Sequence, residues 1–278
     1  MQKYEAIKQP KLAASIFMDG VNKRVRVDDI RGNLSSLLTR LKNEVESAQC
    51  EKLIIKAREY QFKTLLELGF VHEGVVNRYF NGDSVHFMSK FIKDERRTSK
   101  YWSEEDDILA AVQELRKHPH KKDIEQSILL AETSDAEKLA HLYKEVFQLY
   151  PVPLHDPRYI REAMNKGTIF VCIKENGQVI SAASAEIDFQ YKNAEITDCA
   201  TLPQYRKGGF MKNLISKLED ELLSQGIFCS YTIARALSYG MNAVFHQLGY
   251  QYRGRLANNC YIYDKLEDMN IWEKDLGQ

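Results

Sequence analysis

The C-terminal part of the chain alternates between two hydrophobic patterns. Apolar residues three or four apart predict helices, and apolar residues two apart predict strands. From residue 126 onward these patterns follow one another without long interruptions. The predicted elements are, in order, a short strand at 128–131, helices from 134 and 156, strands at 168–174, 179–189 and 195–201, a helix at 210–225, a strand at 227–234, a helix at 241–248, and strands at 250–256 and 259–263.

The N-terminal part repeats the end of this series. A strand-like run at 53–58, a helix at 62–68 and two further strand-like runs have the same order as the elements from residue 230. The element Leu68-Gly69-Phe70 returns 180 residues later as Leu248-Gly249-Tyr250. Two copies are too few for a solenoid, so the pattern predicts a duplicated domain in which one copy kept the chemistry.

A charged segment separates the two copies. We therefore predict an N-terminal non-catalytic domain at 1–95, a helical linker at 96–125 and a catalytic domain at 126–278. The N-terminal copy is expected to act as a scaffold that packs on the catalytic domain or builds a homodimer.

Composition and charge exclude several classes of protein. The chain has 39 basic and 39 acidic residues, so no overall positive field favours nucleic acid or an anionic membrane. No apolar stretch suggests a signal peptide or a membrane span, which makes the cytoplasm the expected location. The five cysteines form an odd set without CxxC pairs, so we expect buried thiols and neither a disulfide framework nor a metal site.

The segment most suggestive of chemistry is Pro203-Gln204-Tyr205-Arg206-Lys207-Gly208-Gly209, which leads from a predicted strand into a helix at Phe210. A glycine-bearing turn before a helix holds phosphate well, because free N–H groups and the helix dipole face the anion. The pattern alone is equally compatible with an ordinary tight turn. It is neither a Walker loop nor a G-x-G-x-x-G dinucleotide fingerprint.

Together with the order of elements, this loop resembles that of the GNAT acetyltransferases, which bind the pyrophosphate of acetyl-CoA with an Arg/Gln-x-x-Gly-x-Gly/Ala segment. Arg206 and Gly209 match, whereas Met211 stands where a small residue is expected. The resemblance implies an α+β GNAT fold, a mixed and mostly antiparallel sheet flanked by helices, with a degenerate GNAT-like half domain at the N-terminus.

Further segments, at 194–203, 238–242, 248–250, 258–259 and 269–272, look like the β-lysine ε-N-acetyltransferases. That group makes N-ε-acetyl-β-lysine, a compatible solute, from β-lysine and acetyl-CoA. The resemblance therefore implies a small-molecule amine as the acceptor. Two alternatives stay open: another amine, such as lysine, a polyamine or a protein lysine, and a non-catalytic acyl-CoA-binding regulatory module.

The resemblance also assigns cofactor-binding residues. Backbone N–H groups near Ala200 to Leu202 would hold the pantetheine and polarise the thioester oxygen. Asn242 fits either a cofactor contact or a structural cap, and Phe245 stands where many relatives have a tyrosine acid. The expected cofactor-binding set is Ala200, Thr201, Leu202, Arg206, Lys207, Gly208, Gly209, Phe210, Met211, Asn242 and Phe245.

An alkyl ammonium with a pKa of about 10.4 must lose a proton before it attacks a thioester, and a carboxylate assists this step. Glu195 and Asp198 are the candidates, and strict alternation would place them on opposite faces unless a bulge intervenes. Tyr239 is the candidate acid for the leaving thiolate, and Cys199 is expected to pack and not to carry the acyl group. Candidate cations for the substrate carboxylate or the cofactor phosphates are Arg161, Arg206, Arg253 and Arg255.

Overall fold

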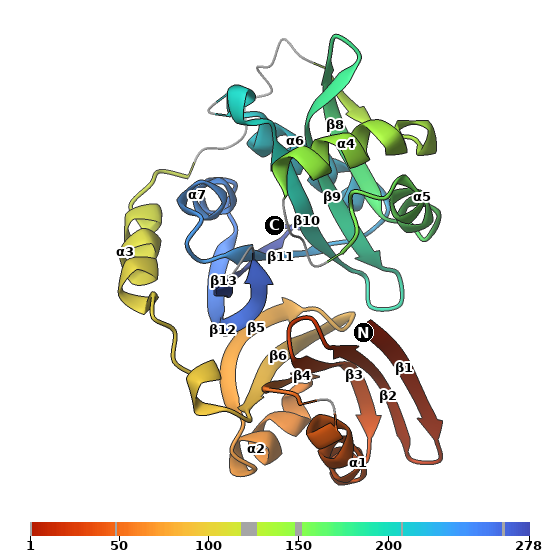
Figure 1. Cartoon of the computed structure of the whole chain (residues 1–278), viewed down its shortest axis with the longest axis vertical. Coiled ribbons are helices and arrows are strands. Elements are labelled where there is room, and N and C mark those ends of the chain that lie inside the picture. Colours follow the sequence, from red (N-terminus) through yellow and green to blue (C-terminus); the bar gives the residue numbers. More distant parts are fainter. Residues whose placement is uncertain (1, 48, 118–126, 148–151, 207, 263–264) are drawn as a thin grey trace.

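One continuous sheet of 13 strands runs through the molecule, in the order β1-β2-β3-β4-β6-β5-β12-β13-β11-β10-β9-β8-β7 (Figure 1). The computed structural model describes residues 2–47, 49–117, 127–147, 152–206, 208–262 and 265–278. Strands from the first third of the chain form one half of this sheet and strands from the rest form the other half. Among the described residues, no helix is long and apolar enough to cross a membrane.

The C-terminal half has the predicted order of helices and strands. Its elements are β7 (Ile128–Leu130), α4 (Ala136–Val146), α5 (Pro157–Asn165), β8 (Ile169–Glu175), β9 (Gln178–Asp188), β10 (Asn193–Thr201), α6 (Phe210–Ser224), β11 (Cys229–Arg235), α7 (Tyr239–Gln247), β12 (Gln251–Ile262) and β13 (Lys265–Asp275). Helices α4 and α6 pack on β9 and β10. As the sequence predicts, Asp156 caps α5 by accepting a hydrogen bond of 2.9 Å from the Arg158 N–H.

The N-terminal half contains β1 (Gln2–Gln9), β2 (Leu12–Asp19), β3 (Arg24–Gly32), α1 (Leu34–Ser47), β4 (Lys52–Ala57), α2 (Glu59–Glu67), β5 (Val71–Arg78) and β6 (Gly82–Phe91). Its strands pair in the same way as β8 to β13. Strands β3 and β4 are parallel, as are β10 and β11, and all other neighbours are antiparallel.

The two halves meet where β5 pairs with β12, through Gly74 and Gly254. These glycines lie at the same place in the two copies, five residues after Gly69 and Gly249. Equivalent residues that pair antiparallel lie on a pseudo-two-fold axis, which relates one half of the sheet to the other. A Cβ on Gly254 would lie 2.2 Å from the Glu73 carbonyl oxygen, so the junction requires glycine.

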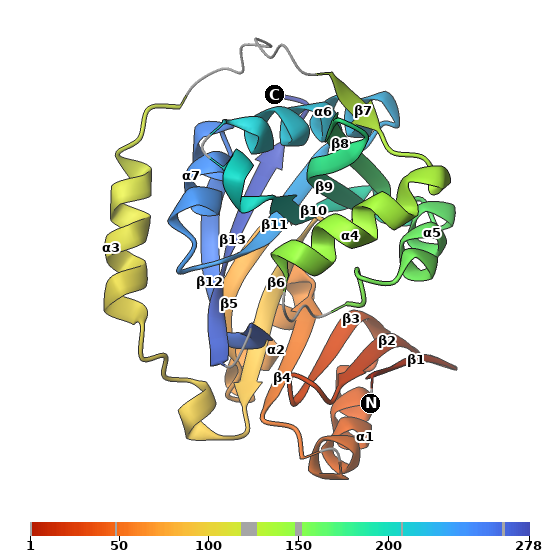
Figure 2. The same cartoon turned by 45° about the horizontal axis from the view of Figure 1, so that its top comes forward.

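The apolar core has three parts. One lies in the C-terminal half, one in the N-terminal half, and the third spans the junction with residues such as Ile54, Phe87, Tyr231 and Leu256. Helix α3 (Trp102–Gln113) connects the halves along the outside of the molecule and packs against α7 (Figures 1 and 2).

The prediction of the two closing strands is wrong. Strand β12 continues to Ile262 through Asn258 and Asn259, and the segment 269–272 lies inside β13. Paired asparagines are typical of turns, but here both are buried. Asn258 forms a bulge with a φ of 44°, and its N–H bonds Asp268 Oδ1 at 2.8 Å.

Candidate active site

The site begins where β10 and β11 separate. These parallel strands pair only over Asn193 to Glu195 and Cys229 to Tyr231, although β10 continues to Thr201 and β11 to Arg235. Beyond the paired residues the two backbones enclose a gap. Helix α7 borders this gap with Met241 and Phe245.

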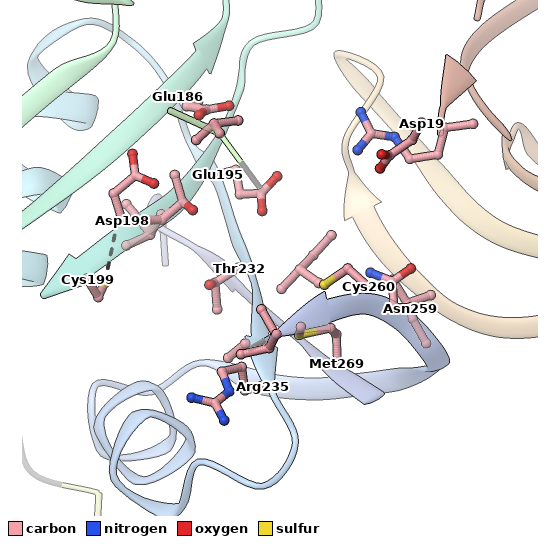
Figure 3. Close-up of a pocket in the computed structure, with 18 of the residues that line it drawn as sticks. Asp19, Glu186, Glu195, Asp198, Cys199, Thr232, Arg235, Asn259, Cys260 and Met269 are labelled. Atoms are coloured by element: carbon pink, nitrogen blue, oxygen red, sulfur yellow. Dashed lines mark hydrogen bonds between the residues drawn. The ribbon is translucent and has the colours of Figure 1, made fainter. Parts of the chain in front are cut away.

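A cavity of about 350 Å³ extends from this gap to the N-terminal half of the sheet (Figure 3). This volume lies within the range of small-molecule sites, about 300–1,000 Å³. Part of its lining is apolar, including Ile196, Ile233 and Phe147. Its charged lining residues are Asp19, Arg24, Arg26, Lys56, Glu186, Glu195, Asp198 and Arg235.

A β-bulge brings the two predicted carboxylates to this one cavity. The register of β10 against β9 shifts between Thr197 and Ala200, and Asp198 has a φ of 51°. The bulge breaks the alternation of side chains along β10, so Glu195 and Asp198 both line the cavity (Figure 3). Asp198 is held there by the Ser184 hydroxyl, at 2.6 Å from its Oδ2.

A third carboxylate, Glu186, lies directly opposite Glu195 on the neighbouring strand β9. Like charges in this position destabilise a sheet. Burial, together with the negative charges of Asp198 and Glu195, raises the pKa of Glu186 to about 8. No hydrogen bond or ion pair to Glu186 occurs among the described residues, so its carboxyl is available to a ligand in the cavity.

Burial also raises the pKa of Glu195, despite the opposing influence of Lys56 and Arg26 and a hydrogen bond of 3.1 Å from the Tyr231 hydroxyl. A carboxylate with a raised pKa is a stronger base near neutral pH than an ordinary one. Three acidic groups, Glu186, Glu195 and Asp198, therefore line the cavity from β9 and β10, and at least two of them accept protons more readily than usual.

The predicted cofactor loop lies at the other end of the gap. Ala200 and Leu202 are buried, and the Leu202 N–H is bonded to the Ile180 carbonyl at 3.0 Å. Thr201 bonds Ser181 at 2.7 Å, and the Arg206 side chain turns back onto the Thr201 carbonyl at 3.3 Å. The side chains of this part of the loop thus mainly fix its shape.

Helix α6 begins at Phe210 after Gly209, which has a φ of 75°. The space next to Gly209 is open, and the first turn of α6 contains no acidic residue. Met211, in the same turn, is partly buried against the core. Gly208 packs close to the Phe210 ring, and Lys207 lies outside the described residues. The first turn of an α-helix has N–H groups without intrahelical partners, which suit an anion.

Asn242 is completely buried, and protein groups satisfy its side chain. Its amide donates to the carbonyls of Arg235 at 2.9 Å and Ser238 at 2.8 Å, and its oxygen accepts from Asn270 at 2.9 Å and Trp272 at 2.8 Å. Of the two predicted roles, this geometry matches the structural one. Asn242 fixes the start of α7 against β11 and β13.

Two other predicted residues on α7 lie in different surroundings. Phe245 is buried and lines the cavity beside the Tyr250 ring. Tyr239 is 46% exposed and is not among the residues that line the cavity. The structure therefore places Phe245, and not Tyr239, on the wall of the cavity that Glu195 and Asp198 also line.

All five cysteines are free thiols, and four of them are buried, as predicted. Cys199 lines the cavity, but burial and the neighbouring Asp198 raise its pKa, so the thiol stays protonated. A protonated thiol is a poor nucleophile. Among the described residues, no group of His, Cys, Asp and Glu is arranged to hold a metal ion.

None of the four predicted arginines lines the cavity. Arg161 pairs with Glu137 on the surface, Arg253 pairs with Glu273, and Arg255 pairs with Asp106. The cations that do line it near the carboxylates are Arg26 and Lys56, which the sequence did not single out. The sequence signal at Arg26 is the alternation of the charged residues Arg24, Arg26 and Asp28 along the segment that forms β3, and such an alternation is also typical of a solvent-exposed face.

The chain is similar to known proteins. Residues 136–250 match the family described as "Acetyltransferase (GNAT) family". The N-acetyltransferase YodP of Bacillus subtilis is 38% identical over 98% of this chain and 99% of its own length. Two proteins named beta-lysine N(6)-acetyltransferase are also similar: that of Methanococcus maripaludis is 34% identical over 93% of this chain and 95% of its own length, and that of Methanosarcina mazei is 38% identical over 73% and 83%.

Among solved structures, the ribosomal-protein-S18-alanine N-acetyltransferase of Escherichia coli matches 54% of this chain and 94% of its own, at 20% identity and a TM-score of 0.48. The match to the family model and the similarity to relatives over nearly their whole length point to one family. The chain belongs to the GNAT acetyltransferase family. It is thus an acetyl-CoA-dependent N-acetyltransferase with an α+β GNAT fold.

Proposed function

We propose that this enzyme transfers the acetyl group of acetyl-CoA to the ε-amine of β-lysine, giving the compatible solute N-ε-acetyl-β-lysine. The observation that carries the proposal is the cluster of Glu186, Glu195 and Asp198 at the gap between β10 and β11. A diamino acid brings two ammonium groups, and this cluster provides the negative charge to receive them. The two relatives named for β-lysine align with this chain over most of its length.

The residues present fit acetyl-CoA. The N-terminus of α6, with Gly209 before it and Arg206 beside it, suits the pyrophosphate, and the gap along Ile196 to Cys199 suits the pantetheine. When bound, acetyl-CoA supplies the thioester carbonyl that the amine attacks.

Glu195 acts as the base in this proposal. Its raised pKa allows it to take a proton from the ε-ammonium at neutral pH, and the Tyr231 hydroxyl fixes the orientation of its carboxylate. Asp198, which lies on the bulge and is fixed by Ser184, holds the same ammonium. Phe245 and Ile196 exclude water from the wall nearby. Tyr239 lies outside the wall, so Tyr239→Phe is expected to leave turnover near the wild-type level.

Incubation of the protein with acetyl-CoA and β-lysine, with detection of free thiol, tests the activity. We expect thiol release and a product whose acetyl group is on the ε-nitrogen, as determined by NMR. Failure to release thiol above the rate without amine, in protein that still binds acetyl-CoA, would exclude β-lysine as the acceptor. The same assay with lysine, spermidine and a lysine peptide identifies another acceptor if there is one.

A non-catalytic acyl-CoA-binding module is the second candidate, because Met211 and Phe245 depart from the family pattern. The double variant Glu195→Gln/Asp198→Asn distinguishes it from an enzyme. We expect this variant to lose turnover by a factor of about 100 or more while its affinity for acetyl-CoA stays the same. Absence of turnover in both proteins would favour the regulatory module.

A further inference from the structure

The N-terminal half forms one wall of the acceptor cavity. Its contribution comes from four strands, β1 to β4, and from β6, and it includes both apolar and charged side chains. These residues are Tyr4, Phe17, Asp19, Arg24, Arg26, Ile54, Lys56 and Phe87. Figure 3 shows Asp19 on this side of the cavity, facing Glu186 and Glu195 on the other. A domain that only supported the fold from outside would leave the cavity to the catalytic half.

The pseudo-two-fold axis explains why these residues face the carboxylates. If Ala57-Arg58 is aligned with Ala234-Arg235, Ile54 corresponds to Tyr231. Arg26 pairs with Ile54 and Glu195 pairs with Tyr231, so Arg26 stands at the position of Glu195 in the other copy. Because the pseudo-two-fold axis relates the two positions, Arg26 and Glu195 line the same cavity from its two sides, and their side chains carry opposite charges.

The gap that receives acetyl-CoA in the C-terminal half is closed in the N-terminal half. Arg58 donates to the Ile30 carbonyl at 2.8 Å, and Gln61 donates to the same oxygen at 3.4 Å. Arg235, which corresponds to Arg58, pairs instead with Glu267 at 2.7 Å. The N-terminal copy therefore keeps the cavity-facing strand but has filled the cleft between β3 and β4.

Two cations on this wall share one carboxylate. Arg26 donates two hydrogen bonds of 3.0 Å to Asp28, and Lys56 contacts Asp28 at 3.3 Å and the Tyr79 hydroxyl at 3.0 Å. Burial opposes the charge on Asp28, but Arg26 and Lys56 outweigh it and lower its pKa. The trio thus carries a net charge of about +1 beside the three acidic groups. Arg26 Nη1 has no hydrogen-bond partner among the described residues.

We propose that Arg26 and Lys56, from the non-catalytic half, bind the carboxylate of an amino-acid acceptor and so select amino-acid amines over plain polyamines. This proposal rests on the proposed function, because it assigns the far end of the acceptor whose ε-amine meets Glu195. The cavity then matches a diamino acid along its length, with acidic groups from β9 and β10 for the ammonium groups and a cationic pair from β3 and β4 for the carboxylate. Arg26 is a specificity-determining residue in this arrangement.

The test compares two acceptors that differ only in the carboxylate, β-lysine and 1,4-diaminopentane. In Arg26→Gln we expect the KM for β-lysine to rise about 10- to 100-fold, since a charge-assisted hydrogen bond is lost. The KM for 1,4-diaminopentane and the KM for acetyl-CoA should stay within about two-fold of wild type. Lys56→Gln should have the same effect with a smaller magnitude, and Arg26→Lys should retain part of the discrimination.

Two further variants control for structural effects. Arg26→Gln/Asp28→Asn removes both charges of the Arg26–Asp28 pair and leaves Lys56 its hydrogen bond to the Tyr79 hydroxyl, so it should fold and show the same KM pattern. Arg31→Gln removes a cation from the same strand that lies outside the cavity wall, and it should behave as wild type.

The outcomes separate this proposal from the proposed function. If wild type acetylates β-lysine but Arg26→Gln and Arg26→Gln/Asp28→Asn keep its discrimination against 1,4-diaminopentane, the carboxylate site is wrong and the function stands. A rise in the KM for acetyl-CoA alone would assign the cations to the cofactor and overturn the proposal. If wild type prefers lysine to β-lysine, the proposed acceptor is wrong. Lysine and cadaverine, which differ only in the carboxylate, then replace β-lysine and 1,4-diaminopentane in the same experiment.

Discussion

At the scale of single residues, the site concentrates groups that would be unfavourable elsewhere. Glu186 and Glu195 lie opposite each other on paired strands, and both have raised pKa values. Asp198 adopts a positive φ on the bulge. Such costs are retained in proteins where a ligand offsets them, and a bound ammonium group would do so here.

The raised pKa of Glu186 should make the stability of the folded protein depend on pH. Its pKa is 4.5 in a model peptide and about 8 in the folded protein, so between these values the folded state binds an extra proton. Stability from this group is present at low pH and is lost as the pH rises toward 8. Glu186→Gln should therefore have a higher unfolding temperature than wild type at about pH 9. Its unfolding temperature should also change less than that of wild type between about pH 5 and pH 9.

Thermal unfolding at constant ionic strength measures this effect. Glu105 also has a pKa raised to about 8, by burial and by Asp268, so the wild-type profile alone does not isolate Glu186. The comparison is between variants at each pH. Glu162→Gln, at an exposed position outside the cavity, is the control and should follow wild type. Parallel profiles for Glu186→Gln and wild type would contradict the assignment.

At the scale of elements, the junction between β5 and β12 holds the two halves in register. Gly74 and Gly254 pair there, and a Cβ on Gly254 would meet backbone atoms of Glu73 and Gly74 at 2.2 and 2.5 Å. Backbone atoms in a sheet cannot move aside as a flexible side chain can. Both walls of the cavity depend on this contact.

Gly254→Ala should therefore destabilise the protein by about 2–4 kcal/mol, through the clash and the φ of 143°. Gly240→Ala is the matched control, because it lies in α7 with open space around it and should be neutral or stabilising by up to about 1 kcal/mol. Urea denaturation measures both. Equal stability of the two variants would show that β5 and β12 can separate without cost.

At the scale of the whole molecule, buried cations from the N-terminal part bind the bulged end of β12. Lys52 donates to the Ala257 carbonyl at 2.8 Å, Arg96 to the Asn258 carbonyl at 2.8 Å, and Arg24 to the Asn259 carbonyl at 2.9 Å. Arg96 also pairs with Glu51 at 3.0 Å. These bonds, with the shared sheet, should make the two halves unfold together.

We expect a single calorimetric unfolding transition for the wild type. Arg96→Leu leaves buried carbonyls and Glu51 short of a partner, so it should destabilise by about 3–5 kcal/mol or separate the transition into two. The exposed neighbour Arg97 provides the control, and Arg97→Leu should change stability by less than about 0.5 kcal/mol. Two transitions in the wild type would mean that the halves unfold independently.

The sequence by itself determined the features that depend on residues close together in the chain, which are the helices, the strands and their ends. Helical and alternating spacing predicted the elements from β7 to α7, and Asp156-Pro157 predicted the start of α5, because these signals act within a few residues. The loop before Phe210 and the strand with Glu195 predicted the family. Local rules failed at Asn258 and Asn259, where backbone bonds to Arg96 and Arg24, more than 100 residues away, outweigh the turn preference of asparagine.

Only the tertiary structure decided which side chains share the cavity. Arg26 and Lys56 lie on strands whose spacing is equally typical of a solvent-exposed face, and they meet Glu195 because β5 pairs with β12 across the junction. The bulge that brings Asp198 beside Glu195 depends on the register of β10 against β9. Contacts between residues so distant in sequence depend on how the sheet closes, and no local pattern in the chain records that.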